Sequence, residues 1–172
     1  MKQSAIETIG RPSCTGCSAC VAVCPVKTVE MKENKLGFIE PINSSECKNC
    51  GICTEVCPVI HEELVNSAEP KDTYSTWSNS SDVLKESSPG SIFYEVARLV
   101  IEAGGKVSGS VMKEHRPHHI ISDDLKEVGW MRGAKYIQSK ILRVFSTIGC
   151  TTQDSPFLFY GTPCQVAAVK NL

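Results

Sequence analysis

A cysteine pattern that occurs twice constrains the fold of this chain more than any other feature. Each copy reads C-x2-C-x2-C-x3-C followed by proline, and the two copies are 33 residues apart at all four positions. A pattern repeated at a constant offset indicates an internal duplication. The first copy consists of Cys14, Cys17, Cys20 and Cys24, and the second of Cys47, Cys50, Cys53 and Cys57.

The spacing indicates iron–sulfur chemistry. Steps of three residues let a tight loop bring three thiolates to three irons of one 4Fe–4S cluster, while the fourth cysteine points away from it. Structural zinc sites use separated pairs of cysteines rather than such triplets. Eight cysteines in disulfides need an oxidising compartment, whereas Met1–Gly10 lacks the apolar segment of a signal peptide, so we expect a cytoplasmic protein.

The two copies resemble bacterial two-cluster ferredoxins over about residues 8–62. In those proteins the fourth cysteine of each copy binds the cluster of the other copy. The resemblance implies two 4Fe–4S clusters. One would be held by Cys14, Cys17, Cys20 and Cys57, and the other by Cys47, Cys50, Cys53 and Cys24.

Charge and hydropathy exclude two classes of partner. The chain has 18 basic and 19 acidic residues and a net charge of −1, so it lacks the basic excess of nucleic-acid-binding proteins. No apolar run approaches the ~18 residues that a membrane span needs. We therefore expect neither a nucleic-acid partner nor a membrane span.

Periodicity predicts further elements on both sides of a polar segment at residues 65–80. Residues 29–42 predict two strands around Asn34 and Gly37, with apolar side chains such as Leu36 and Phe38 covering the clusters. We expect a short edge strand at 74–77, and strands at 107–112, 118–121 and 157–160. We expect a helix from an N-cap at Ser88, with a stripe of Ile92, Val96, Leu99 and Val100 that Phe93 and Ala97 widen. Two further helices are expected at 123–128 and 140–148.

The segment Gly161–Gln165 follows a predicted strand and opens a helix. Thr162 and Gln165 form a capping box with Pro163 between them, which puts Cys164 at the second helical position, where the helix dipole favours a thiolate. Such a turn also offers free N–H groups to a phosphate. The alternative interpretation is a well-capped helix in which Cys164 is a small packed residue, and both remain open.

Residues 72–172 resemble the amino-terminal domain of the coenzyme F(420) hydrogenase/dehydrogenase beta-subunit family. The matching segments are 87–93, 105–109, 132–139 and 161–165. Members of that family are iron–sulfur flavoproteins, so the resemblance implies FAD or FMN as a further cofactor. The residues it would place at the flavin are Ser88, Gly90, Arg132, Lys135, Gln138, Gly161, Thr162, Cys164 and Gln165.

The chain departs from that family in two respects. Its loop reads Ser-Ser-Pro-Gly-Ser where the family usually has Ser-Ser-Ser-Gly-Gly, so Pro89 removes an N–H donor. The family also continues for about as long again after the Thr-Pro-Cys-Gln turn, so we expect a truncated member or a fragment. A complete flavin pocket is not expected within 172 residues.

Together these observations predict an α+β protein. A two-cluster ferredoxin-like domain at 1–64 is followed by a linker or edge strand at 65–80 and a truncated α/β domain with a mixed sheet at 81–172. The predicted function is electron transfer through the two clusters, within an oxidoreductase beta subunit or a fragment of one, between a redox partner protein and a flavin or deazaflavin. The alternatives are a stand-alone ferredoxin-like carrier with a docking domain, and a zinc-stabilised interaction protein. No residue indicates acid–base catalysis.

Overall fold

The computed structural model describes residues 3–62, 72–87, 90–151 and 155–172, and for residues 149–151 the backbone alone. Its contacts form two units, Met1–Glu69 with Thr162–Leu172, and Pro70–Gly161. Residues 162–172, which the sequence analysis assigns to the second domain, thus group with the first unit. Helices combined with one antiparallel and one mixed sheet confirm the α+β class. None of the helices in the described ranges is long and apolar enough to cross a membrane.

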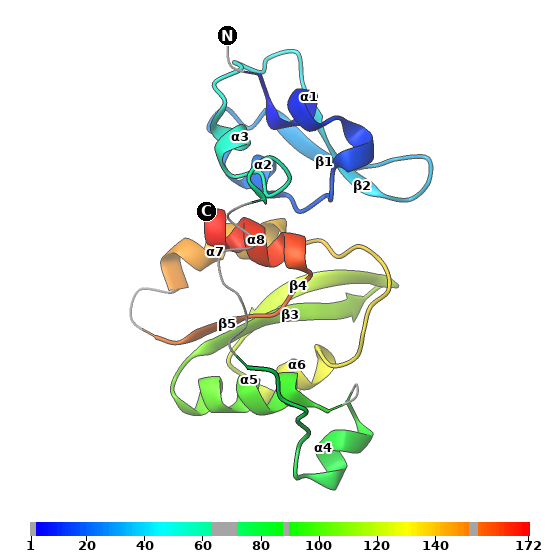
Figure 1. Cartoon of the computed structure of the whole chain (residues 1–172), viewed down its shortest axis with the longest axis vertical. Coiled ribbons are helices and arrows are strands. Elements are labelled where there is room, and N and C mark those ends of the chain that lie inside the picture. Colours follow the sequence, from blue (N-terminus) through cyan, green and yellow to red (C-terminus); the bar gives the residue numbers. More distant parts are fainter. Residues whose placement is uncertain (1–2, 63–71, 88–89, 152–154) are drawn as a thin grey trace. The chain divides into compact units, whose positions relative to one another are not determined.

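The first unit contains short helices around an antiparallel hairpin (Figure 1). Its elements are α1 (Ala5–Ile9), the 3-10 helix η1 (Arg11–Ser13), α2 (Ala19–Ala22), β1 (Val29–Glu33), β2 (Ile39–Asn43), α3 (Ile52–Glu55) and α8 (Pro163–Asn171). The predicted hairpin is confirmed, and Oδ1 of Asn34 closes its turn by accepting the N–H groups of Leu36 at 2.9 Å and Phe38 at 3.1 Å. The prediction that Leu36 and Phe38 cover the clusters is wrong. They belong to the hairpin turn and are 81% and 62% exposed.

The duplication seen in the cysteines extends to the backbone. Helices α2 and α3 begin and end at positions that are 33 residues apart. The residue before each helix is left-handed, with φ of +69° at Ser18 and +82° at Gly51. The loop residues Gly16 and Asn49 are also equivalent, with φ of +66° and +49°. Each half therefore makes the same two left-handed turns between its cysteines, with glycine at one of them.

The second unit is built on the three-stranded sheet β4-β3-β5. Its elements are α4 (Ser81–Lys85), α5 (Ile92–Glu102), β3 (Lys106–Lys113), β4 (Arg116–Ser122), α6 (Leu125–Trp130), α7 (Leu142–Thr151) and β5 (Phe157–Phe159). β3 pairs antiparallel with β4 and parallel with β5, as the predicted mixed sheet requires. The edge strand expected at 74–77 is wrong. Residues 72–80 form no strand, and Tyr74 and Trp77 are exposed.

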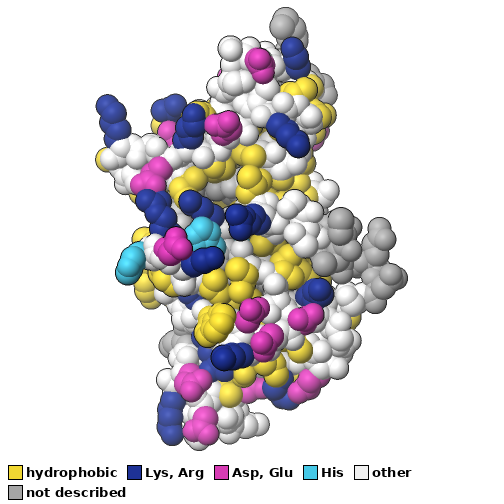
Figure 2. Space-filling model, turned by 180° about the vertical axis from the view of Figure 1, so that it is seen from behind, with side chains coloured by type: hydrophobic (Ala, Val, Ile, Leu, Met, Phe, Trp, Pro, Cys, Tyr) yellow, Lys and Arg dark blue, Asp and Glu magenta, His cyan; other side chains and the backbone are white. Residues whose placement is uncertain are grey.

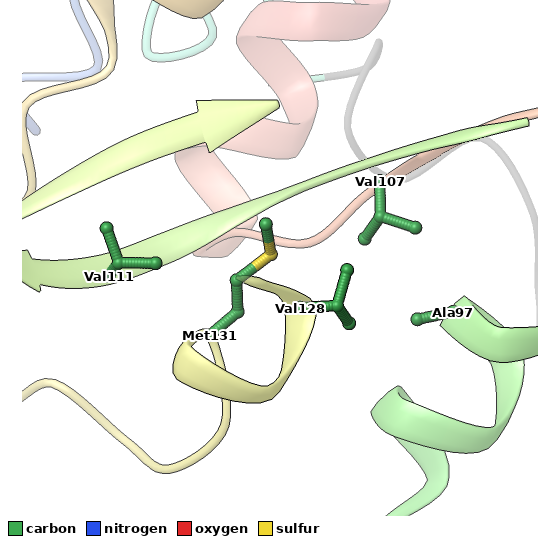
Figure 3. Packing of buried hydrophobic residues seen from close by; sticks show 5 residues of the cluster. All are labelled: Ala97, Val107, Val111, Val128 and Met131. Carbon is green, nitrogen blue, oxygen red and sulfur yellow. The ribbon is translucent and has the colours of Figure 1, made fainter. Parts of the chain in front are cut away.

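Helices α5 and α6 cover one face of this sheet, and α7 lies on the other (Figure 1). The core between sheet and helices consists of Ala97 from α5, Val107 and Val111 from β3, Val128 from α6, and Met131, all at most 8% exposed (Figure 3). Gly109 of β3 lets Met131 approach closely, because a Cβ at that position would stand 2.7 Å from its sulfur. The sheet thus has a closely packed apolar face.

The apolar stripe predicted for α5 is confirmed in part, since its members Phe93, Ala97 and Val100 pack in the core while the others are exposed. Ile92 and Val96 are 39% exposed and Leu99 is 57% exposed, whereas Ala97 is fully buried and Phe93 packs beside it. The helix is apolar along two adjacent lines, and the line with the small Ala97 approaches the sheet. The helix also begins later than predicted, at Ile92, while the expected cap Ser88 lies outside the described residues.

Several surface charges in this unit are paired. Arg98 of α5 contacts Glu95 at 3.4 Å and Glu102 at 2.7 Å on its own helix. Over much of the face seen in Figure 2, Lys and Arg side chains lie beside Asp and Glu side chains. The charge on this face is therefore mixed rather than separated by sign.

Candidate metal centre

Four cysteines from both copies of the pattern meet at one cavity. Cys14, Cys17 and Cys20 come from the first loop, and Cys57 follows α3 in the second copy. The cavity has an atom-free volume of about 350 Å³, part of which opens to solvent. Its lining residues are Ala5, Ile6, Ile9, Cys14, Thr15, Gly16, Cys17, Ser18, Ala19, Cys20, Pro41, Cys57 and Val59. The structure thus brings together the four thiols that the sequence assigns to one cluster.

The walls of this cavity disfavour negative charge. Burial raises the pKa of Cys17 to about 11 and the pKa of Cys20 to about 12. Burial also raises the pKa of Cys14, although the N–H of Gly16 donates to that sulfur. Neighbouring thiols add to these shifts. The thiolates therefore gain from a group that supplies positive charge, which iron does.

Helix α1 contributes to this site and is absent from the sequence analysis. Ala5, Ile6 and Ile9 form part of the cavity wall, and the N–H of Ala5 donates to Sγ of Cys53 at 3.3 Å. The helix starts with a capping box in which Ser4 and Glu7 exchange hydrogen bonds at 3.3 Å. The S-x-x-E pattern was the signal that would have found it.

The other four cysteines lie in a more open environment. Cys50 is exposed, and Cys24, Cys47 and Cys53 are half-buried. Although burial acts to raise it, the pKa of Cys24 is lowered overall by hydrogen bonds from the Thr28 hydroxyl and from nearby backbone N–H groups. Oγ1 of Thr28 lies 3.6 Å from Sγ of Cys24.

The first set of cysteines fits the chemistry of a cluster with thiolate ligands. Among the described residues, no three His, Cys, Asp or Glu side chains are arranged to hold a single metal ion. A 4Fe–4S cluster places each thiolate on a different iron, so its sulfurs stand further apart than those around one ion. Apolar walls and N–H donors to sulfur are the surroundings that such clusters use.

The residues predicted for the flavin have other partners or lie elsewhere. Arg132 pairs with Glu86 at 2.8 Å and stacks over the Tyr94 ring at 3.6 Å. The Lys135 ammonium donates to the carbonyl oxygens of Trp130 at 3.3 Å, Met131 at 2.9 Å and Arg132 at 2.7 Å. Burial lowers the pKa of Lys135. These two cations therefore stabilise the C-terminal end of α6 and the segment after it.

Gly90, Gln138 and Gly161 belong to the second unit. Gly90 has φ of +84°, and a Cβ there would stand 2.9 Å from the carbonyl oxygen of Thr76. Gln138 is half-buried, as is Gly161, and Ser88 lies outside the described residues. Their predicted role at a flavin stays a prediction.

The capping box of α8 is confirmed. The N–H of Thr162 donates to Oε1 of Gln165 at 2.9 Å, and Cys164 occupies the second helical position. Sγ of Cys164 lies 3.2 Å from Oγ1 of Thr162. Cys164 belongs to the same unit as the first cavity but is not among the residues that line it.

Residues 13–60 match the family model of the 4Fe-4S dicluster domain. No curated protein matches the chain. These comparisons give no support to the resemblance of residues 72–172 to the hydrogenase/dehydrogenase beta-subunit family. A dicluster domain indicates iron–sulfur clusters and electron transfer, and ferredoxin-like domains usually pass electrons to partner proteins. The chain is thus an α+β protein with a ferredoxin-like 4Fe-4S dicluster domain near its N-terminus.

Proposed function

We propose that the chain transfers single electrons between two redox partner proteins, or between a partner and an oxidoreductase subunit, through two 4Fe–4S clusters. The observation that carries this proposal is the cavity at which Cys14, Cys17, Cys20 and Cys57 meet. A 4Fe–4S cluster held by these cysteines would supply one-electron transfer that needs neither a proton nor a new covalent bond. The crossed assignment, with Cys24 joining Cys47, Cys50 and Cys53, belongs to the proposal.

The residues of the chain perform three tasks in this function. The cysteines bind the irons as thiolates. Ala5, Ile6, Ile9 and Val59 keep water from one side of the first site. The N–H of Ala5 and the hydroxyl of Thr28 lie at sulfur atoms of the second set, where such donors stabilise added negative charge.

The flavin is not part of the proposal. The resemblance that implies it lacks support from the comparisons, and Arg132 and Lys135 are engaged within their own unit. The alternative of a stand-alone carrier with a docking domain differs from a flavoprotein in one spectroscopic feature. Flavin bands in the anaerobic absorption spectrum separate the two.

Anaerobic reconstitution with iron and sulfide tests the proposal. About eight irons and eight sulfides per chain are expected, with the absorption bands of 4Fe–4S clusters that bleach on reduction. As a control, Cys164→Ser removes a half-buried thiol outside both copies of the pattern and should leave the iron content unchanged. Tight binding of stoichiometric zinc in place of iron, or clusters that no one-electron donor reduces, would contradict the proposal.

A further inference from the structure

The two sets of cysteines differ in what surrounds them. The first set lines a cavity whose other walls are mostly apolar, and its fourth member, Cys57, is buried. The second set includes Cys50, which is exposed. Reduction adds one negative charge to a site that already carries four thiolates. Burial in apolar surroundings disfavours this addition and exposure to water favours it.

A carboxylate lies near the first site. Glu40 is 15% exposed and precedes Pro41 in β2; Pro41 lines the cavity, and the Glu40 side chain leaves the strand on the other face. Oε1 of Glu40 contacts Nη1 of Arg11 at 3.3 Å, and Oε2 accepts from Nδ2 of Asn34 at 3.3 Å. Arg11 is the first residue of η1, and its backbone carbonyl oxygen accepts the N–H of Cys14 at 3.2 Å. After burial and the neighbouring Cys57, the carboxylate of Glu40 also acts to raise the pKa of Cys14. The guanidinium of Arg11, which pairs with Glu40, opposes that effect.

A hydroxyl lies on the side of the second set. Oγ1 of Thr28 is 3.6 Å from Sγ of Cys24, and Thr28 is 7% exposed. A thiolate bound to iron has no proton, so the hydroxyl is the donor in that state. The N–H groups of Val26, Thr28 and Val29 also donate to this sulfur. Donors to sulfur stabilise the extra electron and raise the reduction potential. The first set has donors too, from Gly16 at Cys14 and from Ala19 and Thr15 at Cys17, so the predicted order depends first on the burial of Cys57, the exposure of Cys50 and the charge of Glu40.

We propose that the site of Cys14, Cys17, Cys20 and Cys57 has a lower reduction potential than the site of Cys24, Cys47, Cys50 and Cys53, and that Glu40 and Thr28 are positioning residues that set this difference. The inference rests on the proposed function and gives it a direction. A low-potential one-electron donor that reduces the first site is oxidised by one electron. That electron then passes to the second site, which holds it at equilibrium.

Potentiometric titration of the reconstituted chain, followed by electron paramagnetic resonance, tests this order. The wild type should show two separate midpoints. Glu40→Gln should raise the lower midpoint potential by up to ~59 mV, which corresponds to a change of about tenfold in the equilibrium constant of one-electron reduction. Thr28→Val should lower the higher midpoint and leave the lower one in place. Glu30→Gln is the matched control. It removes another carboxylate of the same hairpin, one that pairs with Lys32 at 3.5 Å, and it should leave both midpoint potentials unchanged.

Iron and sulfide contents of each variant show whether its clusters are intact. If Glu40→Gln loses iron, Arg11→Gln is tested in its place. It should decrease the potential of the first site, because the negative charge of Glu40 then lacks the positive charge of Arg11 beside it. Coincident midpoints in the wild type, or a shift by Glu30→Gln as large as that by Glu40→Gln, would overturn the inference while leaving the proposed function standing. Absence of reducible clusters would instead refute the proposed function.

Discussion

Nε2 of His119 lies 3.2 Å from the backbone carbonyl oxygen of Tyr160. Because a carbonyl can only accept, Nε2 carries the proton, and Nδ1 is left to accept from the hydroxyl of Ser139 at 3.0 Å. The ring is 5% exposed and stacks on Phe159 with centroids 5.7 Å apart. A neutral imidazole thus links β4 to the end of β5 and to the loop before α7.

This geometry predicts a pH-dependent stability. Burial lowers the pKa of His119 from its ordinary value of 6.5, with Lys135 acting in the same direction, while the hydrogen bond to Tyr160 acts against it. Below pH ~6.5 the unfolded state therefore binds a proton that the folded state does not, and the free energy of unfolding falls as the pH falls. Urea unfolding between pH 5 and 7, followed by tryptophan fluorescence, measures the slope.

His119→Gln should flatten that slope, since the amide donates to Tyr160 without titrating in this range. His115→Gln is the control, because His115 is exposed in the turn between β3 and β4. An unchanged slope in His119→Gln would assign the pH dependence to other groups.

Double variants test the crossed assignment of the cysteines. Cys17→Ser with Cys57→Ser should remove one cluster and leave about four irons per chain, because both cysteines belong to one site. Cys17→Ser with Cys24→Ser should remove both clusters and leave almost no iron. Iron analysis after anaerobic reconstitution decides the matter, and the reverse pattern would assign each cluster to a single copy of the pattern.

Gly105, which follows α5, has no room for a side chain. A Cβ there would stand 2.7 Å from Cγ1 of Val100 and 2.8 Å from its carbonyl oxygen, and closer still to the carbonyl oxygen of Pro156. Gly105→Ala should therefore lower the free energy of unfolding by about 1–3 kcal/mol. Gly129→Ala in α6 meets nothing within 4 Å and should raise it by roughly 0.5–1 kcal/mol. Equal effects of the two substitutions in thermal unfolding would contradict the packing described here.

Arg132 should contribute to stability through its packing. Its side chain is 10% exposed, contacts Glu86 and lies over Tyr94. Arg132→Met should cost about 1–2 kcal/mol in urea unfolding, because it removes the ion pair and the cation–π contact together. Arg98→Met, which removes an exposed arginine with two carboxylate partners, should change stability by about 0.5 kcal/mol or less. A smaller effect for Arg132 than for Arg98 would assign Arg132 no structural role.

The sequence predicted most elements of the second unit because strand alternation and the glycines that end α5 are local signals. It predicted one wide apolar stripe on α5, but not that only the part with Phe93, Ala97 and Val100 faces the sheet. Both lines are apolar, and the choice depends on the small size of Ala97 against β3, a contact between segments far apart in the chain. The cysteine spacing indicated the cluster chemistry, but the cavity wall from α1 depends on how Ala5 meets Cys53 across 48 residues.

In the two copies, glycine occupies different members of the pair of left-handed positions, and this has a consequence for engineering. Left-handed backbone occurs at Gly16 and Ser18 in one half and at Asn49 and Gly51 in the other, so each half keeps one strained residue at a different place. The halves are therefore not interchangeable parts. A chain built from two first halves would repeat the strain of Ser18, and one built from two second halves would repeat that of Asn49. A minimal electron-transfer module is better assembled by taking the glycine of each half, which removes a cost of roughly 1 kcal/mol at each non-glycine position.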